Sequence, residues 1–430
     1  MKNGFALSTL AALSAITLAA CTSASSSSTG SGTTSDQVST GVIKIGAALS
    51  LTGDRQVDGV AFKAGYQLWA ADVNAKGGIK VGGIQRKVKL TILDDKSDQN
   101  TVVADYQTLF GKDHVDLAFG PFSTLLTGPA SAVAARFGMA LLEGAGGGPA
   151  VFDTPSNQAD HNVFDVSLPV ADSLVPFVNW IATLPADQRR QLRAAYAMAQ
   201  DPFADPPVQL AQTELQALGV QTVYSQTFPE LAGPNFSAYK TPADDVAQLN
   251  PDIVILGSPD VPTVQEFMQA FEQKHYNPKM FLAAAGPDQG AAFTSVVGAG
   301  NANGMMVPDG WYPGFADPVS KNMVQEYVHQ YGGSASGVNA DVAEAYAVGQ
   351  VAAQSVTATG GTDNQKIISF LHSGVTLKSV QGPVHFDALG ENGSATAFIF
   401  QWQHGDFHQV LPLGAPGSDP ITATKPHWSS

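Results

Sequence analysis

The sequence predicts an α/β protein made of two doubly wound, Rossmann-like lobes. Apolar runs typical of strands alternate with helical spacings from Val42 to Glu143, and the same alternation restarts after Asp165. The chain has 430 residues, of which 44% are hydrophobic and 14% charged, so it can form two or three domains with large cores. Strands that alternate with helices indicate βαβ units and a parallel sheet with helices on both faces.

In the first half, residues 42–49 form a short apolar strand that leads into a loop over residues 50–59. Apolar residues then recur with helical spacing at Val60, Ala64, Leu68 and Ala71. Gly77-Gly78 ends this helix. The segments that follow are predicted as strands at 88–94, 115–120 and 139–143 and helices at 101–110 and 126–137.

The second half shows the same rhythm. It predicts helices at 171–184 and 207–218 and strands at 193–198, 222–226, 253–257 and 280–284. Ligands of such sheets bind beyond the carboxyl ends of the strands, in the loops that enter the helices. Two lobes that face each other would place these loops around one cleft: 50–59, 120–126, 144–149, 200–206, 258–262 and 285–290. A hinged pair of lobes that closes on a small ligand is an established use of this geometry.

Composition and motifs exclude several classes of function. The formal net charge is −15, with 22 Lys and Arg against 37 Asp and Glu, and basic residues do not cluster, so nucleic acid is not an expected partner. A single cysteine excludes an internal disulfide and a thiolate metal site. The G-x-S-x-G, P-loop, H-E-x-x-H and C-x-x-C motifs do not occur. We therefore expect a binding protein and not an enzyme, with neither a cofactor nor a metal.

The N-terminus predicts export. Residues 1–20 form a secretory signal peptide with a weakly positive start and an apolar run that is too short to span a membrane. Leu18-Ala19-Ala20-Cys21 resembles a bacterial lipobox, in which Cys21 is lipidated and becomes the mature N-terminus. Residues 21–41 are a flexible tether rich in Ser, Thr and Gly. We expect a periplasmic or cell-surface lipoprotein; the alternative is a plain signal peptide and an unmodified thiol.

Several short motifs resemble the type I solute-binding proteins of ABC transporters, in particular the branch that binds branched-chain amino acids and amides. The resemblance covers residues 42–412 in order and at similar spacing. It rests on Ile45–Gly53, Asn74–Ile79, Asp94-Asp95, Gly120-Pro121, Asp201-Pro202-Phe203, Gly286-Pro287-Asp288, Gly382–Asp387 and a hairpin at Phe398–Val410.

The resemblance implies that the chain crosses between its lobes three times, through a three-strand hinge. The crossings would lie near residues 164–168, 305–308 and 393–396. Lobe 1 would then comprise 42–165 plus 308–394, lobe 2 would comprise 166–307 plus 395–412, and 413–430 would be a C-terminal tail.

The resemblance also implies a site for a zwitterionic ligand, both of whose charges must be compensated when it is buried. Ser123 and Thr124, at the start of a helix, and the backbone of Ala145, Gly146 and Gly147 would hold a carboxylate. Asp288 would pair with the ammonium group, and Phe203 would cover the ligand. Further candidates from neighbouring loops are Asp58, Ser258 and Trp311.

Departures from the family pattern leave the ligand open. Gly146-Gly147-Gly148 stands where relatives carry a hydroxyl residue, Phe203 lacks a tyrosine hydroxyl, and Asp288 is shorter than glutamate. These changes admit a ligand that is larger, more apolar or differently charged. Structural alternatives also remain. Ser123 and Thr124 could only cap a helix, residues 144–148 could only form a turn, Phe203 and Trp311 could only pack, and Asp288 could be an N-cap.

The sequence as a whole predicts a lipid-anchored monomeric receptor. It would capture an amino acid, an amide or a related aromatic or aliphatic carboxylate and deliver it to the transmembrane subunits of an ABC permease. Two alternatives remain: a sensor that passes the bound state to a signalling partner, and an extracytoplasmic hydrolase that acts at the cleft.

Overall fold

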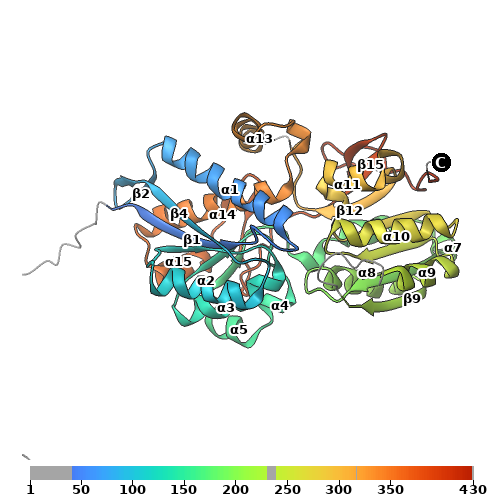
Figure 1. Cartoon of the computed structure of the whole chain (residues 1–430), viewed down its shortest axis with the longest axis horizontal. Helices are drawn as coiled ribbons and strands as arrows, with labels where there is room; N and C mark the ends of the chain where they lie inside the picture. The colour runs from blue at the N-terminus through green and yellow to red at the C-terminus, as the bar shows by residue number, and fades with distance from the viewer. Residues whose placement is uncertain (1–40, 230–238, 316, 429–430) are drawn as a thin grey trace, which may run out of the picture. The chain divides into compact units, whose positions relative to one another are not determined.

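The computed structural model describes residues 41–229, 239–315 and 317–428. They belong to one compact unit, Thr40–Ser430, which contains two main sheets with their helices (Figure 1). The predicted signal peptide, Cys21 and nearly all of the predicted tether lie outside the described residues. None of the helices in the described ranges is long and apolar enough to cross a membrane.

Lobe 1 is built on a parallel five-stranded sheet with the order β4-β1-β5-β6-β7. Its strands are β1 (Ile43–Leu49), β4 (Val88–Asp94), β5 (Leu117–Phe119), β6 (Leu141–Glu143) and β7 (Val163–Asp165). Two small hairpins join it: β2 (Ile79–Val81) with β3 (Ile84–Arg86), and β13 (Leu377–Ser379) with β14 (Gly382–Val384).

The helices of lobe 1 come from two separate parts of the chain. The first part supplies α1 (Gln56–Ala75), α2 (Gln99–Gly111), α3 (Thr124–Arg136), α4 (Pro149–Phe152) and α5 (Pro155–Asp160). The second supplies α13 (Pro318–Tyr331), η4 (Ala335–Gly337), α14 (Ala340–Thr359) and α15 (Asn364–Leu371). Apolar residues of α1, α13, α14 and α15 share one core with β1 and β5, so the second part completes lobe 1.

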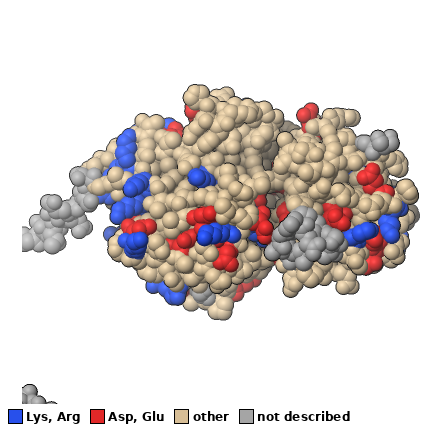
Figure 2. All heavy atoms as spheres, in the orientation of Figure 1, with Lys and Arg blue, Asp and Glu red and all other residues tan. Residues whose placement is uncertain are grey.

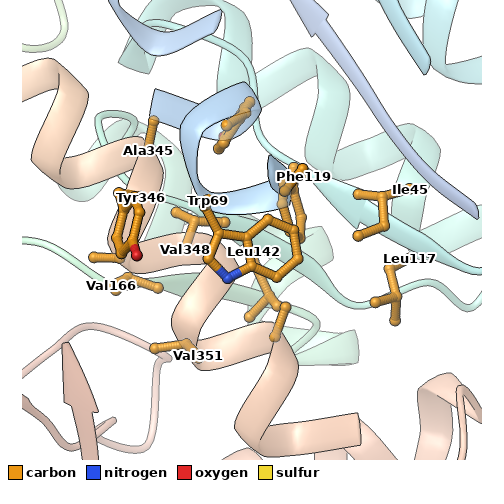
Figure 3. Packing of buried hydrophobic residues seen from close by; sticks show 14 of the residues in the cluster. Ile45, Trp69, Leu117, Phe119, Leu142, Val166, Ala345, Tyr346, Val348 and Val351 are labelled. Carbon is orange, nitrogen blue, oxygen red and sulfur yellow. The ribbon is translucent and has the colours of Figure 1, made fainter. Parts of the chain in front are cut away.

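The contact between α1 and α14 depends on small residues. A Cβ on Gly349 would lie 2.1 Å from the Trp69 ring, and a Cβ on Gly65 would lie 2.4 Å from the Val342 carbonyl oxygen. Glycine therefore lets the two helices approach closely. The Trp69 indole fills the space between them and the sheet, among Phe119, Leu142, Val348 and Val351 (Figure 3).

Lobe 2 is built on a seven-stranded sheet with the order β16-β15-β12-β11-β10-β8-β9. β12 (Met305–Asp309), β11 (Met280–Ala283), β10 (Ile253–Gly257), β8 (Arg193–Ala199) and β9 (Gln221–Phe228) are parallel. β15 (Phe398–Gln403) and β16 (Asp406–Leu411) form an antiparallel hairpin that adds to β12.

Helices cover the lobe 2 sheet with two separate apolar cores. One core contains residues of α6 (Val175–Ala182) and α8 (Asp205–Ala217). Residues next to η1 (Val170–Asp172) and α7 (Ala186–Arg189) also pack there. The other involves α9 (Lys240–Leu249), α10 (Val261–Gln273), α11 (Ala291–Val297) and α12 (Ala299–Ala302), near η3 (Pro287–Gln289). Since a parallel sheet buries both faces of its central strands, β10 (Ile253–Gly257) is fully buried and apolar, whereas the edge strand β9 is partly polar.

The structure confirms the predicted fold class. The chain passes from β7 of lobe 1 to α6 of lobe 2, from β12 back to α13, and from β14 to β15. The C-terminal tail packs against lobe 2: the Lys425 backbone N–H donates to Lys279 at 2.6 Å, and the Trp428 indole N–H donates to the Tyr276 carbonyl at 2.8 Å. The tail is therefore part of the folded lobe.

Candidate functional site

A cavity of about 120 Å³ lies where the two lobes meet. A single water molecule needs only about 10–15 Å³ by this measure, so the cavity has room for a small organic molecule. Its wall comes from the loops at the carboxyl ends of the strands in both sheets, together with the start of α14. This is the position that the strand order of doubly wound sheets predicts for a ligand.

Six of the residues predicted to bind a ligand line this cavity: Asp58, Ser123, Ala145, Gly147, Phe203 and Asp288. Three others lie one layer behind the wall. Thr124 Oγ1 donates to the Gly147 carbonyl at 3.1 Å, Ser258 Oγ donates to the Ala285 carbonyl at 2.7 Å, and Gly146 packs against Thr127. Trp311 lies in the core of lobe 1, where its indole N–H donates to Ser320 Oγ at 2.8 Å.

Ser123 occupies the N-cap position of α3, but its hydroxyl group does not cap the helix. Within the described part of the chain, its Oγ makes neither a capping hydrogen bond nor any other, although the residue is only 5% exposed. A buried hydroxyl without a partner is unfavourable by about 1–3 kcal/mol. Because Ser123 lines the cavity, a bound molecule could supply the missing partner.

The loop after β6 has an internal partner that sequence analysis missed. The backbone N–H groups of Ala145 and Gly146 both donate to Glu143 Oε2, the former at 2.9 Å. Glu143 is fully buried. Two of the amides predicted to hold a ligand carboxylate are therefore already bonded to a carboxyl group of the protein.

The glycines of this loop make room for side chains of the protein itself. A Cβ on Gly146 would lie 2.0 Å from Thr127 Oγ1, and a Cβ on Gly147 would lie 2.2 Å from Asp165 Oδ2. The expected extra space for a ligand is thus partly filled by Thr127 and Asp165. The glycines are explained by these close approaches.

Carboxyl groups dominate the polar part of the wall. Six lining residues are acidic: Asp58, Asp165, Asp288, Asp309, Asp341 and Glu344. Among the described lining residues Arg55 is the single basic one. Figure 2 shows acidic side chains where the two lobes meet, while Lys and Arg gather over the part of lobe 1 near β2. The cavity is thus strongly acidic.

Burial and mutual repulsion keep these carboxyl groups from ionising easily. Burial, with repulsion from Asp288, raises the pKa of Asp58 to about 7 and that of Asp309 to about 8. Burial, with repulsion from Glu391, raises the pKa of Asp165 to about 8. The same causes raise the pKa values of Asp341 and Glu344 well above their usual range. A cation in the cavity would lower all of these pKa values.

Direct bonds join the lobes beside the cavity. Arg55, in the loop before α1, donates to Asp201 after β8, with Nη2 and Oδ2 3.0 Å apart. Gln289 of η3 donates to Asp58 Oδ1 of α1 at 2.7 Å and accepts from Asn339 Nδ2, at the start of α14, at 3.2 Å. These bonds hold lobe 2 against lobe 1.

Apolar groups form the remainder of the wall. The cavity is lined by Phe122, Leu168, Val170, Phe203, Pro259 and Pro308. The Phe203 backbone N–H donates to Asp201 Oδ1 at 2.8 Å, which holds the Phe203 backbone next to a residue of the interlobe ion pair. The arrangement suits an organic molecule with an apolar body. In the described ranges no group of three or more His, Cys, Asp and Glu side chains could hold a metal ion.

The sequence analysis did not identify Arg55, Asp165, Asp309, Asp341 and Glu344. Asp165 and Asp309 are the last residues of β7 and β12, so the rule that placed ligands at the carboxyl ends of strands could have found them. Asp341 and Glu344 lie on α14, nearly 300 residues after Asp58. Their approach to the cavity depends on the packing of α14 against α1 and has no local signal.

Two α/β lobes with a ligand-sized cavity between them define a two-lobed binding protein. The sequence model of the periplasmic binding protein family matches residues 42–406. The chain belongs to this family, and the resemblance found in the sequence is thereby confirmed. The family consists of binding receptors.

Solved structures agree on the fold. An ABC transporter substrate-binding protein from Desulfitobacterium hafniense, in complex with Leu, is 17% identical with a TM-score of 0.67, over 86% of this chain and 99% of the other. A Rhodopseudomonas palustris (R. palustris) solute-binding protein in complex with benzoate is 16% identical with a TM-score of 0.69. The match covers 90% of this chain and 100% of the other. A leucine-binding protein from Thermotoga maritima is 17% identical with a TM-score of 0.70, over 86% and 97%.

Proposed function

We propose that this protein is an extracytoplasmic receptor that captures a small organic ligand between its lobes and delivers it to an ABC permease. The observation that carries the proposal is the cavity itself, which has room for a small molecule and is lined by residues of both lobes. Family membership supports it. Binding needs no chemical step, so the protein would act as a carrier and not as an enzyme. We expect it to act as a monomer.

Lobe 1 would bind first and lobe 2 would close over the ligand. Asp58, Ser123, Ala145 and Gly147 belong to lobe 1, whereas Phe203 and Asp288 belong to lobe 2. The bonds from Arg55 to Asp201 and from Gln289 to Asp58 would form only on closure. The ligand would thereby stabilise the closed arrangement, which the permease would recognise.

The related structures contain Leu and benzoate, so amino acids and small carboxylic acids belong in the first ligand screen. Asp288 and its neighbours could pair with an ammonium group. A carboxylate would find the Ser123 hydroxyl and the start of α3. The apolar wall would contact the side chain or ring.

The test is a thermal-shift screen of purified protein after partial unfolding and dialysis, combined with mass spectrometry of any released molecule. A ligand at 100 times its Kd adds about 2.7 kcal/mol to the free energy of unfolding. Binding to the protein, followed by stimulation of permease ATPase activity, is the expected result. Turnover of the bound molecule would instead indicate a hydrolase. If no compound binds and no molecule is released, the proposal is wrong.

We also propose lipid attachment at Cys21, which would hold the receptor at the outer face of the cytoplasmic membrane or at the cell surface. The lone cysteine within Leu18-Ala19-Ala20-Cys21 supports this. Cys21→Ser should move the protein from the membrane fraction to the soluble fraction of cells. Retention of the variant in the membrane would contradict lipid anchoring without affecting the ligand proposal.

A further inference from the structure

The charge of the cavity does not match a zwitterion. Six acidic residues and one arginine line it, and that arginine, Arg55, is already paired with Asp201 at 3.0 Å. A bound amino acid has one ammonium group and one carboxylate, so it adds no net charge. Because burial raises the pKa values of these carboxyl groups, they hold protons in the empty cavity, and a ligand without net charge would leave them so. A ligand with net positive charge would instead favour their ionised form.

The part of the site that would bind the carboxylate of a zwitterion has few free donors. The N–H groups of Ala145 and Gly146 donate to the buried Glu143 carboxyl group, which competes with a ligand carboxylate for the same donors. Asp165 lies beside Gly147, where a ligand carboxylate would otherwise approach. A carboxylate placed there would be repelled by a neighbouring acidic group.

The carboxyl groups lie in two sets. Asp58, Asp288, Asp309 and Asp341 form one set at the junction of α1, η3, β12 and α14, and their carboxyl groups repel one another. Asp165 belongs to a second set, at the end of β7, with Glu143 and Glu391 behind it. Glu344 interacts with members of both sets and connects them along the wall. Two positive charges on one ligand would therefore each meet a separate set.

One carboxyl oxygen of the first set has no donor among the protein's own groups. Asp341 is 9% exposed and lines the cavity; its carboxyl group is hydrogen-bonded to that of Asp58, and its Oδ2 accepts no hydrogen bond from an N–H or hydroxyl group of the described residues. Ser123 Oγ, also on the wall, is in the same situation. An ionised carboxylate only accepts hydrogen bonds, and an ammonium or guanidinium group is a donor whose opposite charge favours that ionised form. Both atoms could accept from such a group.

The apolar wall supplies the remaining requirement. Phe122, Phe203, Leu168 and Val170 line the same cavity, which favours a short hydrocarbon segment and allows contact between a cation and an aromatic ring. From these observations we infer that the cavity selects a small organic dication, namely two ammonium or guanidinium groups joined by an apolar segment of a few carbons. The inference rests on the proposed receptor function and specifies the ligand class of the same site.

The test is calorimetric titration of the purified protein with 1,4-diaminobutane, 1,5-diaminopentane and agmatine. Butylamine, leucine, benzoate and glucose serve as comparison compounds. A diamine is expected to bind at least 10-fold more tightly than butylamine. Asp341→Asn and Asp165→Asn should each weaken diamine binding at least 10-fold, whereas Asp187→Asn, on the exposed surface of lobe 2, should leave it unchanged.

Melting curves without ligand show whether each variant folds, and Asp288→Asn provides a third variant at the wall. If leucine, benzoate or glucose binds and the diamines do not, the dication inference is wrong while the receptor function stands. Equal affinity for butylamine and the diamines would also overturn it. If no compound binds and denatured protein releases no small molecule, both proposals fail.

Discussion

The ion pair between Arg55 and Asp201 joins the lobes and offers a direct test of closure. The two side chains are 12% and 1% exposed, and Nη2 and Oδ2 are 3.0 Å apart. In Arg55→Met the hydrocarbon part is kept and the charge is lost. Asp201 would keep the N–H bonds from Phe203 at 2.8 Å and Ala204 at 3.0 Å, so it would remain hydrogen-bonded in the variant.

The bond to Asp201 accounts for about 1.5–3 kcal/mol of the loss, the value of one charged hydrogen bond. This corresponds to an equilibrium between closed and open lobes that is about 10- to 150-fold less favourable to closure. Single-molecule energy transfer between dyes on Lys112→Cys, in lobe 1, and Glu214→Cys, in lobe 2, measures this equilibrium; both positions are exposed. In the variant made for labelling, the natural Cys21 is replaced by Ser, so that only the two introduced cysteines carry dyes.

A double-mutant cycle with Asp201→Asn separates the pair from other effects of Arg55. The expected coupling energy is about 1.5 kcal/mol or more. Lys76→Met is the matched control, because Lys76, just after α1, pairs with Asp72 of the same helix at 2.7 Å and is 69% exposed, so closure should not change. A coupling energy below about 0.5 kcal/mol would refute the assignment of this pair as a closure contact.

Two further predictions concern stability. Because burial raises the folded-state pKa values of Asp165 and Asp309 to about 8 from 3.8, the folded protein holds protons that the unfolded chain releases. The free energy of unfolding without ligand should therefore fall as pH rises from about 5 to 8, and calorimetric melting that instead shifts upward over this range would contradict the reasoning. Separately, Gly349→Ala places a Cβ 2.1 Å from the Trp69 ring and should lower the free energy of unfolding by about 1–3 kcal/mol in urea titrations. Gly361→Ala is the control, since a Cβ there meets no atom of the described residues within 4 Å; equal effects at both positions would exclude overpacking as the cause.

The site shows how far sequence reasoning extends. The rule that ligands bind beyond the carboxyl ends of parallel strands placed Ser123, Phe203 and Asp288 in loops that do line the cavity. Trp311 was a candidate because its aromatic ring could stack on a ligand, and packing was the alternative. Its burial in the core of lobe 1 arises from packing against α13, which the sequence around it does not indicate.

The sequence by itself determined the alternation of strands and helices, because apolar periodicity is a local property of the chain. Strands such as Ile253–Gly257 and helices such as Asp205–Ala217 lie within a few residues of their predicted positions. The tertiary structure decided which polar groups are already paired. Glu143 accepts hydrogen bonds from two backbone N–H groups of the loop that follows it. Asp341, on α14, lies close to Asp58 of α1. The second contact depends on the packing of segments that are far apart in the sequence, which local periodicity does not determine.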